Sequence, residues 1–139
     1  MSTYAIQTDG SCMPNPGEMG IGIVIYKDGN IENTISEYTG VGTNNIAEYQ
    51  AMIRGLEEIK KWKKPEDRVM IFVDSLLILR QAKGEWKVKN QGLMPYCEKA
   101  KELIKELKNV KILWNARGDN GIADRLAKEA IILKMEGGK

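Results

Sequence analysis

Four acidic residues stand where a folded chain seldom keeps an uncompensated charge. Asp9 follows the alternating stretch "TYAIQT", and Asp74 is the first polar residue after the apolar run "VMIFV". Glu48 lies at the apolar edge of a stretch with helical periodicity. Asp124 lies in the first turn of the last predicted helix. Taken singly, each has an ordinary explanation. Asp9 and Asp74 could be acids just past strand ends, Glu48 a residue on the rim of a helix, and Asp124 a partner of the helix dipole.

Taken together, the four carboxylates predict a site for hard divalent cations. Like charges held close together raise one another's pKa, so a fold keeps them only with a compensating charge. The chain has no histidine, and its two cysteines lack metal-type spacing, so we expect Mg²⁺ or Mn²⁺ on oxygen ligands. Two such ions about 4 Å apart can activate a water and stabilise a leaving oxygen at phosphorus. We therefore interpret Asp9, Glu48, Asp74 and Asp124 as metal ligands and catalytic residues.

The elements predicted around these residues gather them at one edge of a sheet. Strands are expected over 3–9, 21–26 and 31–39, with a Pro/Gly-rich loop over 12–20 and a hairpin turn at Asp28-Gly29. There follow a helix over 45–62, a strand over 68–74 buried on both faces, helices over 75–82 and 95–108, a strand over 110–115 and a helix over 121–133. This order predicts an α/β fold, in which a β-meander followed by βαβ units forms a five-stranded mixed β-sheet flanked by α-helices. Sites in such sheets lie at the carboxyl ends of the parallel strands.

Length and composition predict one domain over residues 1–139. The chain is 42% hydrophobic and 29% charged, which is typical of soluble globular proteins. No apolar run approaches the roughly 20 residues of a membrane span, and the polar start does not resemble a signal peptide. Cys12 and Cys97 are expected to be free thiols in a reducing cytoplasm. We expect a cytoplasmic monomer that does not bind membranes.

Positive charge is concentrated in one segment of the chain. The net charge is +2, but residues 83–111 contain eight lysines against four glutamates, so that segment carries +4 and the rest −2. A solvated helix face explains part of this pattern, and a nucleic-acid-binding patch is the alternative. Within it, Trp86 lies beside Lys87 and Lys89, as in channels where an aromatic ring packs on a sugar and ammonium groups meet phosphates. A tryptophan of the core is the other interpretation of Trp86.

Four stretches of sequence cover nearly the whole chain with recognisable motifs. They are "TDGSCMPNPG" (8–17), "TNNIAEYQAMIRGL" (43–56), "VDSLLILRQAKGEWKVKNQGLMP" (73–95) and "ARGDNGIADRLAKEA" (116–130). In this order they resemble the type 1 ribonucleases H, which have the ribonuclease H-like fold. The resemblance implies a metal-dependent endonuclease that hydrolyses the RNA strand of RNA–DNA hybrids with two metal ions, leaving 5′-phosphate and 3′-hydroxyl ends. It places the catalytic carboxylates at Asp9, Glu48, Asp74 and Asp124.

The resemblance also implies which residues contact the hybrid. The 2′-hydroxyl separates RNA from DNA, and backbone amides and short amide side chains can recognise it. The candidates near the RNA strand are Gly10, Ser11, Cys12, Asn15, Asn44 and Asn45. Thr43 and Asn44 fall where the family holds a phosphate of the DNA strand, and the stretch 43–45 is also suited to capping a helix. Arg117 and Asn120 match the loop before the last carboxylate.

The chain departs from the family pattern at two positions. Leu76 stands where the family often has a glutamine, and Trp114 stands ten residues before Asp124, where many members have a histidine. The chain thus resembles the subset without the loop histidine. Indole does not titrate near neutral pH, so we expect Trp114 to pack beneath the loop and Trp114→Phe to leave catalysis largely intact. Two alternatives stay open: a non-catalytic nucleic-acid-binding module of the same fold, or a related nuclease acting on double-stranded RNA or structured DNA.

Overall fold

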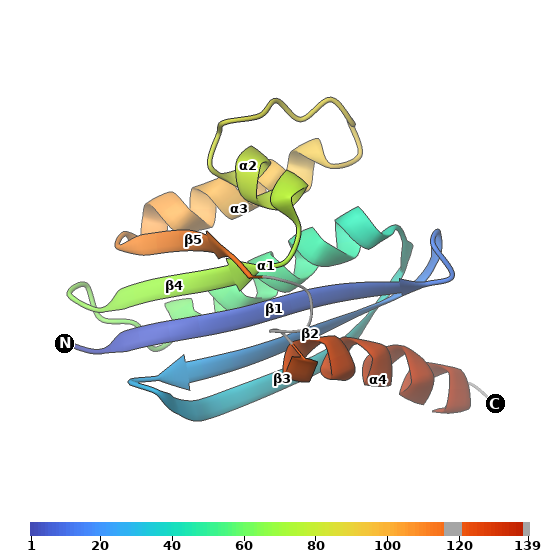
Figure 1. The fold of residues 1–139 in the computed structure, drawn as a ribbon, viewed down its shortest axis with the longest axis horizontal. Coiled ribbons are helices and arrows are strands. Elements are labelled where there is room, and N and C mark those ends of the chain that lie inside the picture. The colour runs from blue at the N-terminus through green and yellow to red at the C-terminus, as the bar shows by residue number, and fades with distance from the viewer. Residues whose placement is uncertain (116–120, 138–139) are drawn as a thin grey trace.

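The strands form one mixed sheet in a computed structural model that describes residues 1–115 and 121–137 (Figure 1). The strands are β1 (Thr3–Met13), β2 (Gly17–Lys27), β3 (Asn30–Gly42), β4 (Arg68–Val73) and β5 (Val110–Trp114), and the helices are α1 (Asn44–Lys60), α2 (Leu76–Ala82), α3 (Met94–Leu107) and α4 (Gly121–Gly137). The sheet order is β3-β2-β1-β4-β5. β1, β2 and β3 pair antiparallel, whereas β1, β4 and β5 pair parallel. The predicted meander followed by βαβ units is therefore confirmed.

The helices cover the two faces of the sheet differently (Figure 1). α1 packs on one face with α2 and α3 beside it, and the apolar stripe that sequence periodicity predicts on α1 is fully buried at Tyr49, Met52, Leu56 and Ile59. α4 packs on the opposite face, across β1, β2 and β3. No helix in the described part of the chain is long and apolar enough to cross a membrane.

Glycine on β2 brings α4 close to the sheet. A Cβ atom on Gly22 would lie 2.0 Å from the carbonyl oxygen of Ala123, and one on Gly20 would lie 2.2 Å from that of Ala127. Any larger residue there would push the helix away from the strand. Because Asp124 follows Ala123 directly, this contact also sets the position of the fourth predicted carboxylate along the sheet.

The first two strands are longer than the sequence suggests. The predicted loop over 12–20 is wrong in extent, since β1 and β2 stay paired as far as Met13 and Glu18 and leave only a short turn at 14–16. Proline and glycine indicated a loop, but the prolines occupy the turn itself and Gly20 serves the contact with α4. Asp9 consequently lies in the middle of a strand, not at its end.

β4 is buried on one face only, which corrects the prediction of burial on both. Val69, Ile71 and Val73 are buried, whereas Met70 and Phe72 remain half-buried. The reason is the placement of α4. This helix packs over β1, β2 and β3 and leaves the same face of the sheet partly open at β4 (Figure 1). The pairing of β1 with β4 ends at Gln7 and Phe72, two residues before Asp9 and Asp74.

Candidate active site

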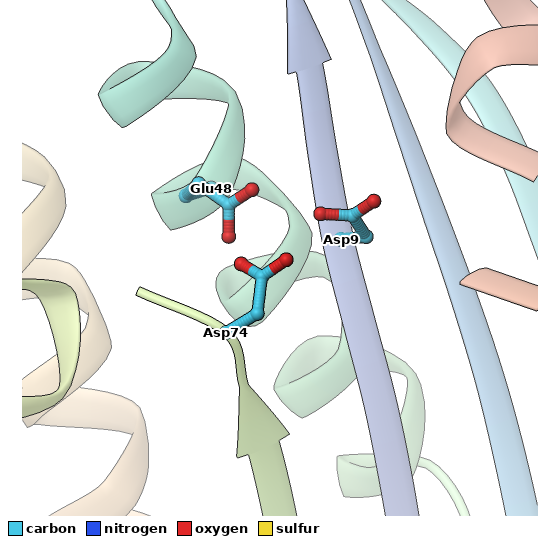
Figure 2. A group of neighbouring side chains, drawn as sticks. All are labelled: Asp9, Glu48 and Asp74. Carbon is cyan, nitrogen blue, oxygen red and sulfur yellow. The ribbon is translucent and has the colours of Figure 1, made fainter. Parts of the chain in front are cut away.

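Three carboxylates from three different elements converge beyond the last paired residues of β1 and β4. Figure 2 shows Asp9 on β1, Glu48 on α1 and Asp74 just after β4, with their carboxylates turned toward one another. One oxygen from each side chain lies within 4.8 Å of the others. Asp9 and Glu48 are buried, at 4% and 8% exposure, and Asp74 is half-buried. The sequence prediction that these three residues gather is confirmed.

Gly10 allows the helix that carries Glu48 to approach β1. A Cβ atom on this residue would lie 2.2 Å from the main-chain carbon of Ala47 and 2.4 Å from the amide nitrogen of Glu48, so only glycine fits. The Gly10 amide then donates a hydrogen bond of 3.0 Å to Glu48 Oε1. Gly10, a predicted substrate contact, thus also positions a carboxylate.

The second carboxylate oxygen of Glu48 indicates that the cluster is suited to binding a cation. Glu48 Oε2 is buried and accepts no hydrogen bond from the described residues. The Asp9 carboxyl lies within hydrogen-bonding reach of Glu48, but it can donate only when protonated. A buried oxygen without a donor beside two further carboxylates is costly for the protein alone and is suited to a hard divalent cation. The residues present therefore fit a metal.

The pKa values of this cluster reflect burial first and crowding second. Burial, together with a hydrogen bond to Asp124 and the charge of Asp74, raises the pKa of Asp9 to about 8, and a hydrogen bond with Glu48 acts in the opposite direction. Burial also raises the pKa of Glu48 well above its ordinary value, and the charges of Asp9 and Asp74 add to the effect. The repulsion inferred from sequence is thus present in the fold.

Asp124 is hydrogen-bonded to Asp9 but is more exposed than Asp9 and Glu48. It lies in the first turn of α4, its side chain is 46% exposed, and its Oδ2 accepts a hydrogen bond of 3.0 Å from Lys128 Nζ. It is not part of the group of carboxylates within 4.8 Å, yet it lines the same cavity as they do. Its greater exposure agrees with its predicted position in a first helical turn.

These four residues open onto a cavity of about 890 Å³. The predicted substrate contacts that line it are Gly10, Ser11, Cys12, Asn15, Thr43, Asn44 and Asn45. Sequence reasoning missed Met13, Ser75, Asn90 and Lys128, which also line it. Ser75 and Lys128 carried a usable signal, because one follows Asp74 directly and the other lies four residues after Asp124, on the same face of a helix. Asn90 comes from a segment without periodicity and gave no such signal.

Comparison with known proteins agrees with this geometry. The family model described as "Reverse transcriptase-like" matches residues 7–130. A ribonuclease H of Neorickettsia sennetsu is 32% identical over an alignment of 143 positions, and the match covers 93% of this chain and 93% of that protein. The crystal structure of a ribonuclease H1 isolated from compost, LC11-RNase H1, is 37% identical with a TM-score of 0.91, covering 97% of this chain and 99% of that one.

The chain belongs to the ribonuclease H family. Its homology to ribonuclease H enzymes, together with the acidic cluster, identifies it as an enzyme of this type. The compost enzyme has also been crystallised in complex with an RNA/DNA hybrid, in a structure that matches with a TM-score of 0.89. A bifunctional protein of Mycobacterium tuberculosis is 34% identical over 128 residues, and this chain spans only 35% of its length.

The polar residues around the cavity are held by hydrogen bonds of their own. Thr43 caps α1, as expected, with its Oγ1 accepting a bond of 3.3 Å from the Ile46 amide. The Asn44 amide donates to Asn15 Oδ1 at 3.1 Å and so ties α1 to the β1–β2 turn. Cys12 is buried, and its thiol donates to main-chain carbonyls. Its thiol is therefore engaged by the protein itself, and both cysteines are free of disulfides, as predicted.

A second cavity of about 580 Å³ adjoins the first and shares Asn45 and Asn90 with it. Trp86, Lys87 and Lys89 all line this second cavity. Trp86 is 50% exposed, so the interpretation as a core residue is wrong. The exposed ring and the two lysines lie together beside the acidic site, and their contact with nucleic acid stays a prediction.

Trp114 makes a hydrogen bond that the sequence did not indicate. Its side chain is 49% exposed, and its indole N–H donates to the main-chain carbonyl of Asp74 at 3.3 Å. The predicted packing beneath the loop over 116–120 concerns residues outside the described part of the chain and stays a prediction. Leu76, the other departure from the family pattern, is 48% exposed at the start of α2. Arg117 and Asn120 lie outside the described residues.

Proposed function

We propose that this chain hydrolyses the RNA strand of RNA–DNA hybrids with two Mg²⁺ or Mn²⁺ ions and leaves 5′-phosphate and 3′-hydroxyl ends. The observation that carries the proposal is the convergence of Asp9, Glu48 and Asp74 within 4.8 Å, with a buried Glu48 oxygen that accepts no hydrogen bond from the described residues. The crystal structure of LC11-RNase H1 with an RNA/DNA hybrid supports the substrate class.

The carboxylates of Asp9, Glu48 and Asp74 hold the metal ions in this account, and Asp124 is an adjustable fourth ligand. Bound at these residues, the ions supply a nucleophile at neutral pH and stabilise the leaving oxygen of an in-line displacement. The protein fixes the geometry in advance: the Gly10 amide orients Glu48, and the strand pairing of β1 and β4 aligns Asp9 with Asp74. Little rearrangement is needed when the substrate arrives.

The hybrid lies across both cavities in this proposal. The RNA strand follows the first cavity, where Ser11, Asn44, Asn45 and the Gly10 main chain contact 2′-hydroxyl groups. Thr43 keeps a hydroxyl hydrogen with which to meet a phosphate of the DNA strand, because its oxygen acts as acceptor in the helix cap.

The second cavity extends the same path for the hybrid. Trp86 packs on a sugar of the DNA strand there, and Lys87 and Lys89 neutralise phosphates. Arg117, Asn120 and Cys12 remain candidates from the family resemblance, with Cys12 contributing through its main chain because its thiol is bonded elsewhere. Trp114 and the lack of any histidine support the proposal that the chain resembles the members without the loop histidine.

A strand-labelled cleavage assay tests the proposal. An RNA–DNA hybrid, an RNA duplex and a DNA duplex are each incubated with the protein in EDTA, Mg²⁺ or Mn²⁺. The proposal expects metal-dependent cleavage of the RNA strand of the hybrid alone. Cleavage of either duplex at a similar rate would indicate the related nuclease instead, and metal-insensitive binding without cleavage would indicate a non-catalytic binding module.

A further inference from the structure

Trp114 joins the end of β5 to the main chain of a catalytic residue. Val73 and Trp114 are the last paired residues of β4 and β5, and the Asn115 amide donates to the Val73 carbonyl at 2.9 Å. The Trp114 indole N–H then donates to the next carbonyl, that of Asp74, at 3.3 Å. The side chain therefore adds one hydrogen bond beyond the last one that the two backbones make.

This extra bond falls in the short connection between β4 and α2. Asp74 belongs to a two-residue connection between β4 and α2. Ser75 fixes the helix side of this connection, because its Oγ accepts a hydrogen bond of 3.2 Å from the Ile78 amide. Trp114 holds the strand side. The direction of the Asp74 carboxylate depends on the main chain between these two attachments.

The exposure of Trp114 indicates which part of the side chain matters. A tryptophan that only filled space would be buried, because its large apolar surface is its main contribution to packing. This indole is 49% exposed and still donates its single N–H to the carbonyl of a metal-ligand candidate. The hydrogen bond is therefore the specific contribution of the residue at this position.

We propose that Trp114 is a positioning residue for Asp74, whose indole N–H keeps the Asp74 carboxylate within reach of Asp9 and Glu48 and so raises the affinity of the cluster for divalent metal. This inference rests on the proposed metal-dependent function. Partners that orient metal ligands typically change metal affinity by about 10- to 100-fold when they are removed. Because Trp114 bonds the main chain of Asp74 and not its carboxylate, the lower end of that range, about tenfold, is expected.

Two variants isolate the N–H group. Benzothienylalanine at position 114 keeps the shape of the bicyclic ring and replaces N–H with sulfur, and Trp114→Phe keeps an aromatic ring without a donor. Trp62→Phe is the matched control, since Trp62 is half-buried beside Tyr4 near the opposite end of β1. Binding of Mg²⁺ and of Mn²⁺ to the free protein is measured by calorimetry, with melting temperature in EDTA and the metal dependence of hybrid cleavage alongside.

The positioning role predicts metal binding about tenfold weaker in both Trp114 variants, cleavage that recovers at high metal concentration, and wild-type binding in Trp62→Phe. Variants that bind metal within twofold of the wild type would overturn it, even if their melting temperatures fall. Unfolding of the benzothienylalanine protein would also overturn it, by making the bond a determinant of the fold. If the wild type itself binds no divalent metal, the proposed function fails and the positioning role with it.

Discussion

Two glutamates on α1 have the same exposed fraction and opposite electrostatic surroundings. Glu48 and Glu58 are each 8% exposed. Glu58 accepts hydrogen bonds from Arg54 at 2.7 Å and Lys61 at 3.1 Å, and the bond from Arg54, joined by that from Lys61, holds its pKa below the ordinary value. Burial raises the pKa of Glu48, and the nearby charges raise it further because they are carboxylates. Residue type, helix and exposed fraction are the same, but Glu48 is held deep among carboxylates, where burial is the largest cause of its raised pKa, whereas the hydrogen bond from Arg54 is the largest cause of the lowered pKa of Glu58.

The contrast separates a structural carboxylate from a functional one. The chain itself supplies the cations that compensate Glu58, and that network needs nothing further. Glu48 has a main-chain amide on one oxygen and no donor among the described residues on the other. Local rules of stability are typically broken at functional sites, and a pKa strongly shifted by burial and a specific charge inside a cavity marks such a site.

Matched substitutions of the two glutamates should show the largest difference. Glu48→Gln should reduce hybrid cleavage on the order of 10²-fold or more, because it removes a ligand where charge develops in the transition state. Asp9→Asn and Asp74→Asn should act in the same way. Glu58→Gln should cleave within about twofold of the wild type, since cations of the chain compensate Glu58. Initial rates on labelled hybrid check this, and a folded Glu48→Gln variant with wild-type turnover would remove Glu48 from the site.

Metal affinity should depend steeply on pH near neutrality. With the pKa of Asp9 at about 8, a metal that binds below this pH must displace a proton. Apparent Mg²⁺ affinity should therefore rise about tenfold per pH unit from pH 6 to 7 and level off above pH 8. Calorimetric titration at each pH provides the measurement. Glu58→Gln should keep the profile and Asp9→Asn should flatten it; a flat wild-type profile contradicts the electrostatic account.

Asp124→Asn should fall between the two glutamate variants. Its side chain is 46% exposed, pairs with Lys128 and lies outside the closely spaced group, so its loss leaves three ligands in place. We expect a decrease of about tenfold in the rate at saturating metal, with less effect on metal affinity than Asp9→Asn. A loss as complete as that of Glu48→Gln would show that Asp124 is an equal ligand.

The stability of the metal-free protein should also depend on pH, and the direction of that dependence differs between Glu48 and Glu58. Asp9 and Glu48 have folded-state pKa values above their unfolded values. The stabilising contribution of Asp9 is full below about pH 4 and is lost as pH rises toward 8, and that of Glu48 is lost in the same direction. Glu58 has a lowered pKa, so its contribution is present above the unfolded value and is lost as pH falls.

Urea unfolding in EDTA should show this difference. Wild-type stability should decline relative to Asp9→Asn between pH 5 and 8, by at most about 1.4 kcal/mol per pH unit for each proton. A wild-type protein whose stability relative to Asp9→Asn does not change with pH would show that Asp9 titrates normally in the folded state.

The sequence predicted the parts of this molecule that depend on local pattern. Helical periodicity marked α1 and its buried stripe, and the change from apolar to acidic residues after β4 marked Asp74. The extent of β1 was missed because its pairing with β2, a contact between strands, sets its length. The partial exposure of β4 was missed because it depends on where α4 packs.

The site was predicted as a set of residues, but not its supporting contacts. The bond from Trp114 to the Asp74 carbonyl joins residues 40 positions apart, and no local pattern signals it. Cys12 was predicted near the substrate and lines the cavity, but the bond of its thiol to the carbonyl of Gly42, 30 residues further along the chain, had no signal in the sequence. Contacts of this kind follow from tertiary packing and become visible only in the folded structure.

The central claim is that a bound divalent cation compensates the carboxylates around Glu48. Thermal unfolding of the wild type, Glu48→Gln and Glu58→Gln in EDTA and in excess Mg²⁺ tests it most directly. Metal at about 100 times its dissociation constant adds about 2.7 kcal/mol of stability, or several degrees. The account predicts this shift in the wild type and Glu58→Gln, and in Glu48→Gln a much smaller shift from a melting temperature in EDTA at or above that of the wild type. Equal shifts in all three proteins would show that the metal binds elsewhere and would contradict the account.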